Sequence, residues 1–203
     1  MIKNIVFDMG EVLVHFSSHR IVEHLDITEE DKELIIQNVF KSKYWALTDF
    51  CISHKEAFEY MKGNLPERLH KIALDCAINW YRPEYLMPRM LDIVKELKDL
   101  GYHLYLLSNA GTNQELYWSQ MPYKQYFDGK LISAEEKTWK PCPEIFQKFF
   151  KKFDLVPEEC LFIDDLKENV ASGFLLGMDG IVFKNPEDLR IELNKFGVKI
   201  KHD

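Results

Sequence analysis

The sequence contains few cysteines and none in a spacing typical of metal binding. The four are Cys51, Cys76, Cys142 and Cys160; no C-x-x-C pair occurs, and the seven histidines are scattered. This distribution argues against a structural zinc site. A chain of 203 residues can form a core without disulfide bonds, so we expect reduced thiols and a cytoplasmic protein.

The sequence also lacks long hydrophobic runs and an excess of positive charge. The apolar run 104–107 is far shorter than the ~20 residues that cross a bilayer, and Asp8 interrupts the apolar N-terminus too early for a secretion signal. With 26 basic and 33 acidic residues the net charge is −7. General nucleic-acid binding needs a basic surface and is disfavoured. A small phosphorylated ligand needs only a metal ion or a few local cations.

Hydrophobic residues make up 46% of the chain and charged residues 29%, which indicates a packed core and excludes global disorder. At roughly 150 residues per domain, the length predicts one domain with a sizeable insertion.

Five short apolar segments have the composition of strands buried on both faces of a parallel sheet. They cover 4–7, 103–107, 130–132, 161–163 and 181–183. Helical spacing of apolar residues recurs at 88–100, 145–153, 168–176 and 186–196. This alternation predicts an α/β fold with a doubly wound parallel sheet and right-handed crossovers.

Residues 16–81 interrupt the alternation, because they contain helical patterns and no convincing buried strand. A block of this length is not an ordinary strand-to-helix loop. It predicts a small helical cap inserted after the first strand, above the carboxyl ends of the strands, where α/β proteins bind ligands. The expected division is a core of 1–15 and 82–203 and a cap of 16–81.

Polar residues follow two of the predicted strands in positions that could meet a ligand. Asp8 ends the first strand, and Gly10 would let the backbone turn sharply and expose a carbonyl. Ser108 and Asn109 follow the strand 103–107, where a hydroxyl and backbone N–H groups could bind an anion. Each piece alone is ordinary turn composition.

A carboxylate pair and a lysine add a stronger signal. Asp164 and Asp165 follow the strand 161–163, and their repulsion requires a cation nearby. A helix cap explains only one of them, and successive side chains of an extended segment diverge, so we expect one to bind an ion directly. Lys140 lies between Trp139 and Pro141 and could hold a fixed positive charge, although lysines are usually exposed.

The order of these pieces resembles the haloacid dehalogenase-like hydrolase superfamily, in its branch with a small helical cap. The matching stretches are Asp8-Met9-Gly10-Glu11-Val12, Ser108-Asn109, Lys140-Pro141 and Asp164-Asp165. The resemblance covers essentially the whole chain and implies a Rossmann-like core. Most members are Mg²⁺-dependent phosphatases, and this chain is similar to those of the α-glucose-1-phosphate type.

The resemblance implies that Asp8 is the nucleophile and becomes an aspartyl phosphate. It implies Mg²⁺ as the cofactor, bound by the carboxylates of Asp8 and Asp165 and the carbonyl of Gly10, with Asp164 close behind. Hard oxygen ligands suit this ion.

It further implies that Ser108 and the Asn109 backbone bind the transferring phosphoryl group and that Lys140 balances its charge. The expected partner is a small phosphorylated metabolite, plausibly a sugar phosphate, with no nucleic acid and no membrane. The oligomeric state is left open.

One position departs from the family pattern. The second residue after the nucleophile is usually an Asp that acts as general acid and base, but here it is Gly10. Such help is worth ~10²–10⁴ in rate. A substrate with a better leaving group could compensate, as could a proton relay through water or a cap residue, with His15 and His19 as candidates, or Glu11.

Two other functions stay open at this point. The chain could be a regulatory protein that keeps the phosphate and metal site but turns over poorly because of Gly10. It could also be a haloacid dehalogenase with the same nucleophile. That reaction needs no metal, so the Asp164-Asp165 pair counts against it, and activity that survives a chelator would favour it.

Overall fold

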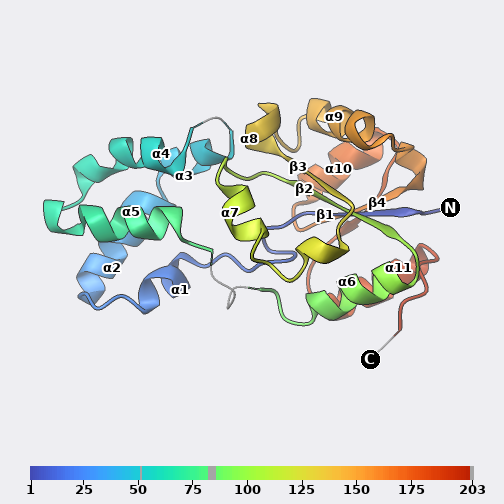
Figure 1. The fold of residues 1–203 in the computed structure, drawn as a ribbon, viewed down its shortest axis with the longest axis horizontal. Helices are drawn as coiled ribbons and strands as arrows, with labels where there is room; N and C mark the ends of the chain where they lie inside the picture. Colours follow the sequence, from blue (N-terminus) through green and yellow to red (C-terminus); the bar gives the residue numbers. More distant parts are fainter. Residues whose placement is uncertain (51, 82–85, 202–203) are drawn as a thin grey trace.

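The computed structural model describes residues 1–50, 52–81 and 86–201 (Figure 1). Cys51 and the predicted domain boundary at residue 82 lie outside these ranges. Five parallel strands form one sheet in the order β3-β2-β1-β4-β5. Their bounds are β1 Asn4–Phe7, β2 His103–Ser108, β3 Gly129–Ile132, β4 Cys160–Asp164 and β5 Asp179–Val182. The predicted α/β class with a doubly wound parallel sheet is confirmed.

The fifth strand starts two residues before the predicted segment 181–183 and ends one residue earlier. Asp179 and Gly180 are poor strand formers, yet they pair with Leu161 and Phe162 of β4. A Cβ atom on Gly180 would lie 2.5 Å from Val170 Cγ1, so close packing of α10 (Lys167–Leu175) explains the glycine in this strand.

Helices cover both faces of the sheet (Figure 1). On one face lie α6 (Met90–Asp99) and α11 (Pro186–Lys195), and on the other lie α9 (Pro143–Phe153) and α10. The apolar residues of α6 recur at helical spacing, and all but the partly buried Leu91 are buried, as the sequence pattern predicts. This helix begins two residues after the predicted start at 88, because Arg89 adopts a left-handed conformation with φ 66°.

The described residues between β1 and α6 contain no named strand. They form a helical block, residues 18–78, whose longer elements are α1 Ser18–Glu23, α2 Glu29–Ile35, a π-helical turn Ile36–Phe40, α3 Lys43–Ala46, α4 His54–Met61 and α5 His70–Ile78. The block has its own apolar cluster, which includes Ile35, Phe58 and Met61. It lies beyond the carboxyl ends of the strands, opposite the N-terminus (Figure 1). No described helix is long and apolar enough to cross a membrane.

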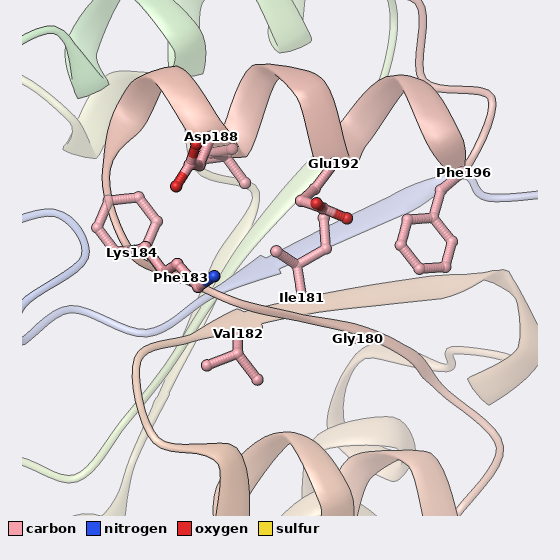
Figure 2. A pocket seen from close by; sticks show the side chains of 9 residues that line it. Gly180, Ile181, Val182, Phe183, Lys184, Asp188, Glu192 and Phe196 are labelled. Atoms are coloured by element: carbon pink, nitrogen blue, oxygen red, sulfur yellow. The ribbon is translucent and has the colours of Figure 1, made fainter.

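The β5 edge of the sheet carries a hollow of about 360 Å³ between the strand and α11. Figure 2 shows Ile181 pointing toward α11, whereas Val182 points to the opposite side, as strand alternation requires. Among its polar residues, Asp188 accepts a hydrogen bond from the Asn185 side chain at 3.0 Å and so belongs to the start of α11. No residue that follows β1 or β2 lines this hollow.

Candidate active site

A buried lysine joins two carboxylates at the carboxyl ends of β1 and β4. Lys140 Nζ lies 2.7 Å from Asp8 Oδ1 and 2.7 Å from Asp164 Oδ2. The side chains of Lys140 and Asp164 are only 1% and 0% exposed, and that of Asp8 is 12% exposed. Lysine is rarely buried unless it is paired, and here one ammonium group contacts two carboxylates.

The sheet register places these groups together. Phe7 of β1 pairs with Ile163 of β4, and the Asp8 N–H donates to the Ile163 carbonyl at 2.9 Å. Asp8 and Asp164 are therefore level at the same edge of two neighbouring strands.

The Asn109 side chain holds Lys140 in place from β2. Its Nδ2 donates to the Lys140 carbonyl at 2.9 Å, and the Lys140 N–H donates to its Oδ1 at 2.8 Å. A planar amide satisfies both backbone groups at once. The sequence predicts a ligand role for the Asn109 backbone but misses this contact, because no local pattern joins residues 31 positions apart.

Ser108 and Ser133 lie at the ends of the next two strands. Ser108 is 1% exposed and its hydroxyl makes a long contact of 3.4 Å to the Asn109 carbonyl. Ser133, at the start of α8 (Ser133–Glu136), accepts from the Ala110 N–H at 3.0 Å and donates to the Asp49 carbonyl. One core hydroxyl therefore links the loop after β2 to the helical block.

Three carboxylates come close enough to share a cation. One ligand oxygen from each of Asp8, Asp164 and Asp165 lies within 4.8 Å of the others. Asp164 already accepts from Lys140, from Asn169 Nδ2 and from the Leu166 N–H. Asp165 is half-buried, and burial together with Asp164 raises its pKa. The oxygen donor set fits Mg²⁺. Of the adjacent pair, Asp164 is already occupied by these hydrogen bonds, so Asp165 is the better placed to bind the ion directly.

The loop after β1 turns sharply through Gly10 and Glu11. Glu11 has φ 53°, and its N–H donates to the Val14 carbonyl at 2.7 Å. Gly10 lies inside the turn as expected, because the Val12 N–H donates to the Met9 carbonyl at 3.4 Å across it, but the left-handed residue of the turn is Glu11. A Cβ atom on Gly10 would meet nothing within 4 Å. Space for a side chain is available here.

The proposed proton relays near this loop are at least partly exposed to solvent. His15 Nδ1 is 2.8 Å from Glu11 Oε2, and both side chains are 40% or more exposed. Glu11 also accepts from the Phe16 N–H at 2.7 Å. His19 is exposed and lines a separate hollow with residues of α1 and α2.

Burial dominates the electrostatics of the site. It raises the pKa of Asp8 to about 6, an effect that Lys140 opposes and Asp164 reinforces. Burial lowers the pKa of Lys140, but the two carboxylates outweigh it, so the net shift is upward. Lys140 therefore remains charged, as its position between two acids requires.

A small cavity of about 160 Å³ lies beside Gly10, between the core and the helical block. The core supplies backbone and small side chains from the loops after β1 and β2. The block side supplies Thr48, Asp49 and His54, and aromatic rings complete the wall; these are Phe16, Trp45, Trp80 and Tyr117. Sequence reasoning names neither Asp49 nor His54 as a site residue.

The comparisons with known proteins agree with this geometry. The model of the haloacid dehalogenase-like hydrolases matches residues 2–177, so the chain belongs to this family. A D-ribitol-5-phosphate phosphatase of Bacteroides thetaiotaomicron is 29% identical over 95% of this chain and 97% of that protein. A glyceraldehyde 3-phosphate phosphatase of Pyrococcus abyssi is 25% identical over 91% of this chain and 82% of its own length.

A solved structure extends the likeness to the fold. The crystal structure of a haloacid dehalogenase family enzyme from Bacteroides thetaiotaomicron, in complex with magnesium and inorganic phosphate, has a TM-score of 0.73 and 26% identity. The match covers 93% of this chain and 97% of that one. The named relatives are phosphatases, which identifies the class of this protein as a phosphoric monoester hydrolase.

Proposed function

We propose that this protein is a Mg²⁺-dependent phosphatase that acts through a phosphorylated Asp8. The observation that carries the proposal is the buried contact of Lys140 with Asp8 and Asp164 at 2.7 Å, with Asp165 close by. A carboxylate that attacks a phosphate dianion needs positive charge around both groups. This cluster is suited to provide it.

Asp8 and Asp165, with the Gly10 carbonyl, would hold Mg²⁺, and Asp164 would orient Lys140 behind them. When bound, the ion supplies positive charge that offsets repulsion between carboxylate and phosphate. Asp8 attacks phosphorus in line with the leaving oxygen, and water then hydrolyses the aspartyl phosphate.

Ser108 and the Asn109 backbone N–H would grip the phosphoryl oxygens, and Lys140 would balance their charge. Rigid positioning of the phosphoryl group matters more in such a transfer than the reactivity of the nucleophile.

The substrate class follows from the cavity beside Gly10. Its volume of about 160 Å³ is below the ~300–1,000 Å³ of sites for drug-sized ligands. A metabolite of a few carbons fits, and the named relatives act on such compounds, D-ribitol 5-phosphate and glyceraldehyde 3-phosphate. We further propose that residues 16–81 form a cap over a core of 1–15 and 82–203, in a cytoplasmic enzyme, and that the cap moves to admit substrate.

Phosphate release tests this proposal. A panel of sugar phosphates, polyol phosphates, nucleotides and a phenolic phosphate is assayed with Mg²⁺ and with a chelator, and Asp8→Asn is the control. We expect turnover that needs the metal and vanishes in Asp8→Asn. Binding of phosphate compounds without turnover would instead support a regulatory role, and release of halide in the presence of chelator would support a dehalogenase.

A further inference from the structure

At position 10, where the family pattern has its general acid, this protein has no side chain. Gly10 borders the cavity that would hold the leaving group, and it carries no acid. An alkoxide leaves poorly without a proton, and a positioned acid is worth ~10²–10⁴ in rate. The lining of the cavity is therefore the place to search for the missing proton donor.

One carboxylic acid, Asp49, lines that cavity together with Gly10. It belongs to the short 3₁₀ turn Leu47–Asp49 of the helical block. Three features tie this turn to the core. Ser133 Oγ donates to the Asp49 carbonyl, and the next residue, Phe50, packs edge-on against Trp139 with ring centroids 4.4 Å apart. The Thr48 carbonyl also lies close to Gly111, 3.0 Å from the position that a Cβ atom on this glycine would occupy. Asp49 thus has a fixed position over the site.

The Asp49 carboxyl group has no competing structural task. Among the described residues its side chain makes no hydrogen bond or ion pair, although it is mostly withdrawn from solvent. Burial and the nearby charge of Asp8 raise its pKa to about 7. A carboxyl group in this state carries a proton for part of the time at neutral pH, which is what a general acid requires.

Two other titratable side chains, Tyr117 and His54, line the cavity, and neither meets the same requirement. Burial and the charge of Asp49 raise the pKa of Tyr117 above its ordinary value, so its hydroxyl is a poorer proton donor than a carboxyl group. His54 is buried and packs edge-on against Trp45, with ring centroids 5.1 Å apart. Burial lowers its pKa to about 4, so the ring is neutral at neutral pH and is a hydrogen-bond partner, not an acid.

We propose that Asp49, supplied by the helical block, is the general acid and base that replaces the side chain missing at Gly10. The inference rests on the proposed phosphatase function. It assigns a catalytic role to a residue outside the core motifs.

The proton and bond changes balance over the two steps. An Asp8 oxygen forms a bond to phosphorus while the bond to the leaving oxygen breaks, and that oxygen takes its electron pair and the proton of Asp49. The alcohol departs, and Asp49 is left as a carboxylate. Water then attacks the phosphorus of the aspartyl phosphate and gives a proton back to Asp49. The bond to Asp8 breaks, and phosphate is released.

The test compares two leaving groups on one variant. Asp49→Asn keeps the size of the side chain and removes the acid. We expect it to lower the rate for an alkyl phosphate, D-ribitol 5-phosphate, by ~10²-fold or more. The phenolate of 4-nitrophenyl phosphate leaves without a proton. For this substrate the rate of the first step, the phosphorylation of Asp8, should therefore fall less than about threefold. This rate is measured as the burst of nitrophenolate. The result is the ratio of the two substrates' rates on one protein sample, so a loss of folded protein affects both rates equally and cancels.

A matched control and a rescue complete the experiment. Asp26→Asn removes an exposed acid of the same block and should change neither rate. Gly10→Asp, added to Asp49→Asn, places a carboxyl group where a side chain meets nothing within 4 Å. The double variant should hydrolyse the alkyl phosphate at least tenfold faster than Asp49→Asn alone.

The outcomes separate the two proposals. If the wild type hydrolyses both substrates but Asp49→Asn slows them equally, or not at all, the role of Asp49 is refuted and the phosphatase function stands. If the wild type hydrolyses neither, or Asp8→Asn is fully active, the proposed function fails and the role of Asp49 fails with it.

Discussion

Replacing Lys140 by methionine would test the charge balance on which the site depends. The variant keeps much of the side-chain length but leaves Asp8 and Asp164 facing each other without the ammonium group that now lies 2.7 Å from each. Removing one partner from a buried ion pair costs ~3–5 kcal/mol, because an uncompensated charge stays in the interior. For a chain of this size, this corresponds to a fall in Tm of about 6–20 °C.

The loss should depend on pH in a defined direction. With Lys140 present, the pKa of Asp8 is already about 6 although the lysine lowers it, and without the lysine the pKa of Asp8 rises further. A carboxyl group whose pKa is raised in the folded state binds protons more tightly when folded, so acid relieves the defect. The deficit in unfolding free energy should therefore be largest near pH 8 and shrink toward pH 5.

Urea unfolding of the metal-free protein at pH 5 and pH 8 measures this effect. Lys148→Met is the matched control, because Lys148 is 38% exposed and its ion pairs are 3.5 Å and longer, so it should cost less than ~1 kcal/mol. Adding Asp8→Asn to Lys140→Met should recover part of the stability at pH 8. A deficit at pH 8 no larger than that of the control would refute the argument.

Three further changes test the surroundings of the site. Gly111→Ala would place a Cβ atom 2.8 Å from the His54 ring. It should displace the helical block and so lower kcat/KM about tenfold or more. Gly63→Ala is the control, because a Cβ atom there meets nothing within 4 Å, and it should leave kcat/KM unchanged. The pKa of His54 is about 4 instead of 6.5, so the folded state resists protonation, and the unfolding free energy should fall by up to about 3 kcal/mol from pH 7 to pH 4. His54→Phe should remove that part of the pH dependence in urea titrations. Asn109→Ala leaves two Lys140 backbone groups unpaired; it should cost ~1–3 kcal/mol in unfolding free energy, and an unchanged urea midpoint would contradict this.

The sheet could be predicted from the sequence because its strands are buried on both faces. Continuous apolar runs at 4–7 and 161–163 have few other interpretations, and parallel strands end at the same edge of a sheet. That rule places Asp8 and Asp164 at the same edge of the sheet, and the pairing of β1 with β4 makes them neighbours. The first residues of β5 did not follow, because Asp179 and Gly180 are paired through contacts that an apolar pattern does not contain.

The remaining site features depend on tertiary contacts. The amide of Asn109 contacts a backbone segment 31 residues away, and no local spacing predicts which polar groups a side chain will find. Asp49 lies in a turn of three residues whose position is set by Ser133 and Trp139, far along the chain. A single acid in an irregular segment has no pattern from which its role could be derived.

The location of the proposed acid has a consequence for how water is excluded from the reaction. Gly10 has room for a side chain, so the absence of an acid there is not forced by packing. An acid on the core would stay beside the phosphate whether the helical block is open or closed. Asp49 is held at the site by contacts of its turn with Ser133 and, through Phe50, with Trp139, and under the proposed cap movement it would leave the site when these contacts break. Proton donation to the leaving group would thereby be coupled to closure, and closure would also remove bulk water and strengthen the electrostatic interactions of Lys140 with its two acids. A bulky phosphorylated substrate that kept the block open would lose the acid as well as the enclosed site, so this arrangement would select small metabolites without a contact to every part of the substrate.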